Sequence, residues 1–312
     1  MNLLTSVNID KAQRQITYND KIMLIGSCFS EHIYHKMQSA YLHAQANPFG
    51  ILYNPMSIVS CIKVLLSPSE LPKAFYSDGL WHSWLHHGSF SQPDLKSFEK
   101  AIEQSLSTGR MILENADIVI FTLGSAWIYE LKTDHTIVGN CHKMPQDMFF
   151  RRRLEVNEIV TEFCQLLQTT SLRNKQIIFT ISPIRHIKDG LHENQLSKST
   201  LFLAIDKIQK ELKDNVNIDY FPAYEIVTDE LRDYRFYASD MLHPSELAIE
   251  YIWQRFSETY FSEQTQNLIR KANQLYLRRE HRILHPNTES AQKFISDTER
   301  LANQLKNMGV DC

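Results

Sequence analysis

Two groups of side chains have the types and spacing that nucleophilic catalysis needs. The first is Ser27 in LIGSCFSEH, where an apolar run ends at Gly26 and a helix-compatible stretch follows. A serine at such a strand-to-helix turn lies beside backbone N–H groups, which predicts either a nucleophile with part of an oxyanion hole or a helix cap. Cys28 is an alternative nucleophile, but neighbouring residues on such a turn point in different directions, so we expect Cys28 to face the core.

The second group supplies a base. In SDMLHPSE, Asp240 precedes His243 by three residues, just before a helical pattern. A loop with this spacing lets both side chains reach one site, where the carboxylate orients the imidazole and His243 takes the serine proton. An isolated Asp-x-x-His is common in surface loops, so the prediction rests on its combination with a strand-end serine.

The elements that must position these residues alternate between strand and helix. Short runs rich in Ile, Val and Phe predict buried strands at 21–27, 117–124, 176–183 and 216–222, and helical patterns occupy 94–116, 154–172 and 195–213. This alternation predicts an α/β fold with a doubly wound, mostly parallel, flavodoxin-like sheet and helices on both faces. The active site is then expected at the carboxyl ends of the strands.

Three regions depart from the alternation. Residues 68–93 are aromatic and His-rich and predict a functional insertion loop, while 127–150 predicts a β-hairpin off the main sheet. A helical pattern covers 245–281, and an amphipathic stripe begins at Ala291. We therefore expect one α/β domain over 1–260 and a C-terminal helical hairpin over 261–312. The hairpin either packs on the core or contributes to a dimer, so the chain is predicted to be a monomer or a homodimer.

Arg185 and His186 follow the third predicted strand and are candidate substrate-binding residues. A cation at a strand mouth binds a carboxylate or a phosphate well. The alternative is an ion pair with Asp189 or Glu193, and the sequence leaves both open.

The insertion holds four more candidate pocket residues. Trp81 and Trp84 either line an acyl or sugar pocket or pack the loop. His86 and His87 are neighbours without an HxH or HxxxH pattern, so we expect a substrate-facing or structural loop and no metal site.

Composition argues against several classes of protein. The net charge of -3 over 312 residues provides no general attraction to nucleic acid or anionic membranes. The five cysteines form no CxxC pair, and the sequence contains neither a membrane-spanning run nor a secretory signal. We therefore expect a cytoplasmic protein without a disulfide framework. No Gly-rich nucleotide loop occurs.

Longer motifs resemble the GSCFA family, and they span residues 21 to about 257: GSCFSEHI, NPFGILYNP, WHSWLHHGSFS, FTLGSAWIYE, SPIRHIKDG, ENQLSKSTL and DYRFYASDMLHPSELAIEYIWQRF. The family in turn resembles the SGNH (GDSL-type) hydrolases and acyltransferases. That resemblance implies that Ser27 corresponds to the serine of Gly-Asp-Ser, and Asp240 and His243 to the Asp-x-x-His pair. It also implies that the N–H groups of Ser27 and Gly50 form the oxyanion hole.

One position departs from the SGNH pattern. Where those enzymes have the oxyanion-binding Asn of Gly-x-Asn-Asp, this chain has Ala126. Losing such a donor costs on the order of 3 kcal/mol in the transition state. The candidate substitutes are Ser125, Asn47, Arg185 and His186, and Ser125 and Asn47 come first because both fall beside predicted strand ends.

The sequence thus predicts a serine esterase or acyl hydrolase for an acyl, often acetyl, ester of a small molecule or carbohydrate. Neither a metal nor an organic cofactor is expected. An O-acyltransferase would use the same residues. A binding protein that has lost efficient chemistry is a further alternative, suggested by Ala126.

Overall fold

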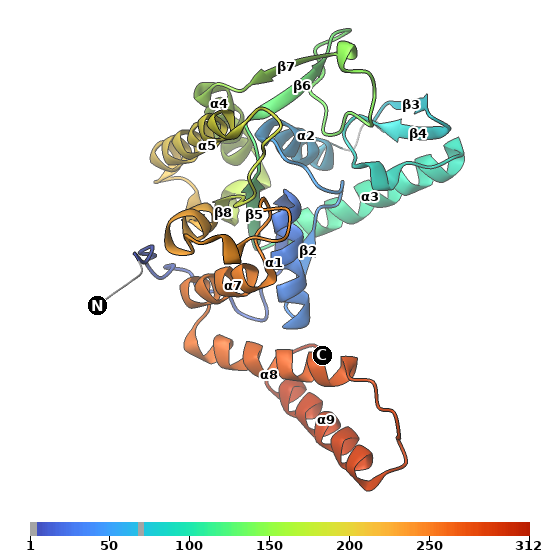
Figure 1. Ribbon diagram of the computed structural model, residues 1–312, viewed down its shortest axis with the longest axis vertical. Coiled ribbons are helices and arrows are strands. Elements are labelled where there is room, and N and C mark those ends of the chain that lie inside the picture. The colour runs from blue at the N-terminus through green and yellow to red at the C-terminus, as the bar shows by residue number, and fades with distance from the viewer. Residues whose placement is uncertain (1–4, 68–71) are drawn as a thin grey trace.

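The computed structural model describes residues 5–67 and 72–312, and its central element is a parallel β-sheet (Figure 1). Across the sheet the strands are β2 (Ala44–Ala46), β1 (Ile22–Gly26), β5 (Ile118–Leu123), β8 (Gln176–Ile181) and β9 (Asn217–Phe221). Every neighbouring pair is parallel. Numbered along the chain, these strands lie in the order 2-1-3-4-5, which is the flavodoxin-like order. The predicted α/β class with a parallel sheet is therefore confirmed.

Helices cover both faces of this sheet (Figure 1). One face carries α2 (Pro55–Leu66), α3 (Leu95–Asn115), α4 (Val156–Thr169) and α5 (Leu191–Leu212). The other carries α1 (Cys28–Ser39) and α7 (Glu246–Tyr260), and a short α6 (Ala223–Glu225) follows β9. Within β1, Met23 packs with the first group of helices and Leu24 with the second. Because both faces are covered, the strands appear in the sequence as continuous apolar runs.

Two antiparallel hairpins lie outside the main sheet. β6 (Trp127–Leu131) pairs with β7 (Phe149–Arg153), so a hairpin does lie off the main sheet, but it extends to Arg153, beyond the predicted 127–150. In the described part of the insertion, β3 (Ala74–Ser77) pairs with β4 (Leu80–Ser83); residues 68–71 lie outside the described residues. The Trp84 ring stacks on Phe75 at 3.8 Å between ring centres. The insertion is therefore a packed hairpin whose aromatic residues stabilise one another.

The C-terminal region differs in one respect from the helical pattern predicted over 245–281. The helix ends at Tyr260, and a second helix, α8 (Glu263–Glu280), begins with Ser262 as its cap. It forms a hairpin with α9 (Glu289–Asn307). Ile269 of α8 is buried in the core cluster that also holds α1 and α7, while the hairpin projects from the sheet-bearing body at the bottom of Figure 1.

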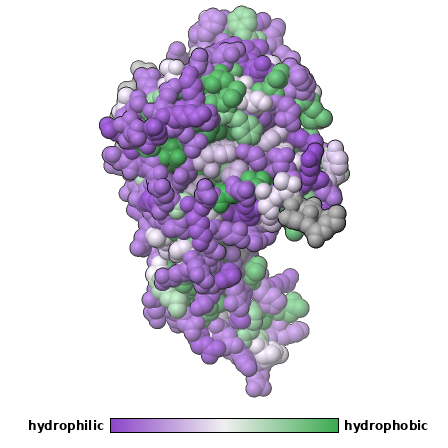
Figure 2. Space-filling view, turned by 90° about the vertical axis from the view of Figure 1, so that its left-hand side faces the viewer, coloured by the Kyte–Doolittle hydropathy of each residue, from purple (hydrophilic) through white to green (hydrophobic). Residues whose placement is uncertain are grey.

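The face shown in Figure 2 is mostly hydrophilic, with apolar residues in separate small patches. Scattered apolar residues of this kind are usual on protein surfaces. Among the described residues, no helix combines the length and apolarity needed to cross a lipid bilayer.

Candidate functional site

The turn after β1 is shaped by a close approach to β5. Gly26 has a φ of +145°, and a Cβ at this position would lie 2.1 Å from the carbonyl oxygen of Thr122. The N–H of Ser27 donates to that same carbonyl at 3.1 Å. Glycine is required here both by its conformation and by the space available.

Replacing Gly26 with alanine is therefore expected to lower the free energy of unfolding by about 3 kcal/mol or more, because the obstructing atom belongs to the backbone of a buried strand. Urea denaturation of Gly26→Ala and of Gly79→Ala measures this. Gly79 also has a positive φ, of +77°, but a Cβ there meets nothing within 4 Å. Equal losses in the two variants would contradict the role of the Thr122 contact.

Ser27 takes the second of its two predicted roles, that of the helix cap, while Cys28, predicted to face the core, is only partly buried against it. Ser27 is fully buried, and its Oγ accepts a hydrogen bond from the N–H of Phe29 at 3.3 Å, so it is the cap of α1. Cys28, the first residue of that helix, is partly exposed. It lines a cavity of about 480 Å³, whereas Ser27 is not among the lining residues. The reason is local: a capping side chain folds over the first helical turn, and the next side chain points away from it.

The cavity lies at the carboxyl ends of the strands, as predicted for this fold. Loops that follow β1, β5 and β8 contribute to its wall, together with the hairpin loop and the segment before α7. Its polar and reactive lining residues include Cys28, Tyr53, Asn54, Ser125, Trp127, Arg151, Arg185, His186, Lys188, Asp189 and His243.

His243 and Asp240 form the predicted pair. The Nδ1 atom of His243 lies 2.5 Å from Oδ2 of Asp240, and Oδ1 of Asp240 accepts the N–H groups of His243 and Leu242 at 3.0 and 2.9 Å. These two N–H groups, with the imidazole, lower the pKa of Asp240 to about 2. The carboxylate is therefore ionised at neutral pH and orients the ring. His243 lines the same cavity as Cys28.

Two predicted oxyanion groups donate to other acceptors, and a third lies away from the cavity. The N–H of Ser27 donates to Thr122, and the N–H of Gly50 donates to the carbonyl of Asn47 at 2.7 Å. Asn47 uses its Oδ1 to accept the N–H of Gly26 at 2.9 Å, while its Nδ2 is buried without a partner among the described residues. Neither Gly50 nor Asn47 lines the cavity, and in the structure these residues hold the end of β1 and the turn after β2.

Other hydrogen-bond donors lie in the cavity wall. Ser125 lines it as predicted, and its hydroxyl lies 3.3 Å from that of Ser197. Asn54, which the sequence analysis missed, caps α2 through Oδ1, so Nδ2 is the end of its amide that a ligand can meet. The N–H of Cys28 is the first of its helix and has no carbonyl four residues earlier within the helix. A signal for Asn54 was present in the Asn-Pro start of its helix, which places a polar amide at a loop end.

Of the six predicted pocket residues, two line the cavity and four do not. Arg185 and His186 line it, whereas Trp81, Trp84, His86 and His87 are not among the lining residues. The imidazole of His186 is largely buried, which lowers its pKa to about 4. His186 is therefore neutral at pH 7 and contributes no positive charge.

The insertion histidines have structural roles. His86 is buried, stacks on Phe49 at 4.2 Å, and contacts the hydroxyls of Ser83 and Ser105. Burial lowers its pKa to about 3, so it is a neutral core residue. His87 packs so closely against Gly50 that a Cβ added to Gly50 would lie 2.3 Å from the Cβ of His87. Trp84 acts indirectly, because its carbonyl accepts the N–H of the cavity-lining Gly139 at 2.7 Å.

A buried lysine was also missed. Lys198, on α5, donates from Nζ to the carbonyls of Gly124 and Ser182 at 2.6 and 2.7 Å, and so joins the ends of β5 and β8. Its side chain is almost fully buried, and desolvation lowers its pKa to about 7. The sequence predicts this helix only from its apolar periodicity, and a lysine in such a helix is expected to lie on the surface.

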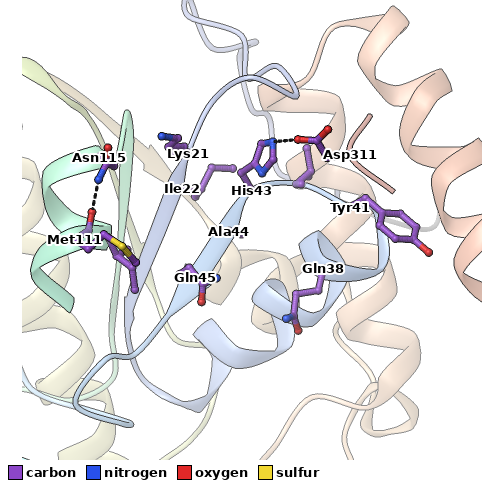
Figure 3. A pocket seen from close by; sticks show the side chains of 12 residues that line it. Lys21, Ile22, Gln38, Tyr41, His43, Ala44, Gln45, Met111, Asn115 and Asp311 are labelled. Carbon is purple, nitrogen blue, oxygen red and sulfur yellow. Dashed lines mark hydrogen bonds and ion pairs between the residues drawn. The ribbon is translucent and has the colours of Figure 1, made fainter. Parts of the chain in front are cut away.

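A second cavity, of about 510 Å³, lies at the opposite, amino ends of β1 and β2 (Figure 3). Its ionic contact joins His43 and Asp311 at 3.4 Å. Neither Cys28 nor His243 lines it, so the cavity at the carboxyl ends is the candidate active site.

Metal ligation finds no support in the arrangement of side chains: over residues 5–67 and 72–312, no three His, Cys, Asp or Glu residues are grouped closely enough to hold an ion. Among curated proteins, none matches the sequence. The family model described as the GSCFA family matches residues 21–256, which include both the turn at Cys28 and the Asp240–His243 loop. The chain therefore belongs to the GSCFA family.

Proposed function

We propose that this protein hydrolyses or transfers acyl groups through a thioester on Cys28. The observation that carries the proposal is that Cys28 and His243 line one cavity, while His243 is oriented by an ionised Asp240. A nucleophile, a base and an orienting carboxylate are the parts that covalent acyl transfer needs.

The chemistry follows from the protonation state of the thiol. Burial raises the pKa of Cys28, and the N–H groups at the start of α1 and the charge of Lys198 offset this only in part. The thiol therefore needs a base. His243 accepts its proton through Nε2, sulfur attacks the acyl carbonyl carbon, and the imidazolium returns the proton to the departing oxygen. Water or an acceptor hydroxyl, deprotonated by His243, then takes the acyl group and releases the thiol.

Three groups are suited to stabilise the oxyanion of this reaction. They are the N–H of Cys28, the amide Nδ2 of Asn54 and the hydroxyl of Ser125, which belong to the cavity-lining residues. They take the place of the N–H groups of Ser27 and Gly50, which already donate to carbonyls of the protein.

The resemblance to SGNH hydrolases gives a second reason to prefer Cys28. The correspondence of Ser27 to the serine of Gly-Asp-Ser is here shifted by one position: matched letter by letter, Gly-Asp-Ser aligns with Gly26, Ser27 and Cys28, so we assign the place of the nucleophilic serine to Cys28 instead. The burial of Ser27 agrees with this alignment. A cavity of about 480 Å³ suits an acyl ester of a small molecule or a sugar.

The test is to trap the acyl-enzyme. Wild-type protein, Cys28→Ala and Ser27→Ala are mixed with p-nitrophenyl acetate, quenched in acid, and analysed by intact-mass and peptide mass spectrometry. We expect an acetyl adduct on Cys28 that hydroxylamine removes, retained in Ser27→Ala and lost in Cys28→Ala. An adduct on Ser27, or labelling of Ser27 by a fluorophosphonate, would assign the chemistry to the serine. A folded wild type without any adduct would favour a binding protein.

A further inference from the structure

The charges that line the active-site cavity do not balance. Three basic side chains line it, Arg151, Arg185 and Lys188, but among the described residues Asp189 is the single lining carboxylate. Both Nη atoms of Arg151 donate hydrogen bonds to that carboxylate, so the charges of Arg151 and Asp189 neutralise each other. Within the described part of the chain, Arg185 and Lys188 have no carboxylate within ion-pair distance.

The pairing that would explain Arg185 as a structural residue does not occur. Its two carboxylate partners foreseen from the sequence were Asp189 and Glu193. Asp189 is held by Arg151, and Glu193 accepts from Arg153 at 3.1 Å. The positive charge of Arg185 therefore remains available to the cavity.

Arg185 is also held rigidly beside the proposed base. Its Nη2 donates to the carbonyl of Met241 at 2.5 Å, and its backbone N–H donates to Leu242 at 3.3 Å, which places it against the loop that carries His243. The guanidinium lies 4.3 Å from the centre of the Tyr237 ring. Its Nε is buried without a hydrogen-bond partner in the described residues. Within the described residues, Nη2 is the one side-chain donor of Arg185 that the protein uses, which is a poor arrangement for a residue whose role is structural.

Lys188 reaches the same cavity from the same loop. Its Nζ donates to the hydroxyl of Tyr129 at 2.6 Å, and Tyr129 is itself a lining residue. The hydroxyl of Tyr129 orients the amine of Lys188 but is not a carboxylate that would pair with it.

We infer that the substrate carries an anionic group, a carboxylate or a phosphate, which Arg185 and Lys188 bind next to the reacting acyl group. The inference rests on the proposed acyl transfer at Cys28 and narrows its substrate class. A fixed guanidinium next to His243 binds an oxyanion without the cost of ordering a flexible side chain.

The test compares two alkylating reagents that differ only in charge. In both, the sulfur of Cys28 displaces iodide, but iodoacetate carries a carboxylate and iodoacetamide a neutral amide. Rates at Cys28 are measured by peptide mass spectrometry, with free glutathione as the reference thiol. We expect the iodoacetate-to-iodoacetamide ratio at Cys28 to exceed that of glutathione by about tenfold, and Arg185→Gln to remove most of this excess.

Two controls separate site binding from general charge. Arg232→Gln removes an exposed cation that does not line the cavity, and it should leave the ratio unchanged. Succinate and inorganic phosphate, compared at equal ionic strength, should protect Cys28, and the anion effective at lower concentration identifies the preferred group.

The outcomes distinguish this inference from the function on which it rests. If Cys28 is alkylated with the ratio of glutathione, the anion site is refuted while the nucleophile stands. If the thiol is inert, calorimetric titration of Cys28→Ala with succinate and with phosphate decides the matter. Binding that Arg185→Gln abolishes supports the anion site even though the proposed chemistry fails, and absence of binding overturns it.

Discussion

The Asp240→Asn protein is expected to lose about 10³–10⁴-fold in the rate of acyl transfer while keeping its fold. The Oδ1 atom of Asp240 holds the N–H groups of Leu242 and His243, and an asparagine oxygen can still accept both. Oδ2, which faces Nδ1 of His243, becomes an NH₂ donor. The imidazole then presents the wrong tautomer to Cys28, so the loop is preserved and the base is lost.

The kcat of acetyl transfer from p-nitrophenyl acetate measures this loss, with the thermal midpoint as the check on folding. Asp233→Asn is the matched control, since Oδ1 of Asp233 likewise accepts a nearby backbone N–H, from Arg235 at 2.9 Å, outside the cavity. Wild-type rates in the Asp240→Asn protein would remove His243 from the mechanism. Because the pKa of Asp240 is about 2, its own titration should not affect activity above about pH 4.

The parallel sheet could be predicted because each central strand is buried on both faces and leaves a continuous apolar run. The edge strand β2 was missed, since Ala44, Gln45 and Ala46 include no β-branched or aromatic residue. The break between α7 and α8 was missed as well, because Phe261 and Ser262 interrupt the helix without a Gly or Pro.

In the candidate site, too, the features that depend on neighbouring residues could be predicted, and those that depend on other parts of the structure could not. The pairing of Asp240 with His243 is a property of four consecutive residues, and the sequence reveals it. The exposure of Cys28 instead of Ser27 depends on the residue at which α1 begins, and a shift of one position exchanges their roles.

Distant partners could not be foreseen. The carbonyl of Thr122 that occupies the N–H of Ser27 lies on another strand, and Arg151 meets Asp189 across 38 positions of the chain. Whether Arg185 keeps a free charge depends on that second pairing, so the sequence left its role open.

Lys198→Met is expected to remove a pH dependence of stability. The pKa of Lys198 falls from 10.5 to about 7 on folding, because burial removes water from the ammonium and, among the described residues, no carboxylate lies within ion-pair distance to offset this. Between these two values the unfolded chain binds more protons than the folded one, so the stability of the wild type rises with pH, by on the order of 1 kcal/mol per unit. Urea denaturation at about pH 7 and 9.5 should show this rise in the wild type and its loss in Lys198→Met.

The test compares the free energies of unfolding at two pH values. The substitution also leaves the carbonyls of Gly124 and Ser182 without a donor, but this cost is the same at both pH values and cancels in the difference. Lys210→Met is the matched control, since Lys210 is an exposed lysine on the same helix. An unchanged pH dependence in Lys198→Met would mean that Lys198 retains an ordinary pKa in the folded protein.

The Lys198→Met substitution should also change the reactivity of Cys28. Below about pH 7, where Lys198 is an ammonium, its charge favours the thiolate of Cys28, so Lys198→Met is expected to slow the alkylation of Cys28 by iodoacetamide at about pH 6. The pH–rate profile separates this electrostatic effect from a structural one, because the loss of the charge slows alkylation only at the pH values where Lys198 is protonated, whereas a distorted site slows it at every pH. Equal slowing at about pH 6 and about pH 9, or no slowing at either, would confine Lys198 to joining the ends of β5 and β8.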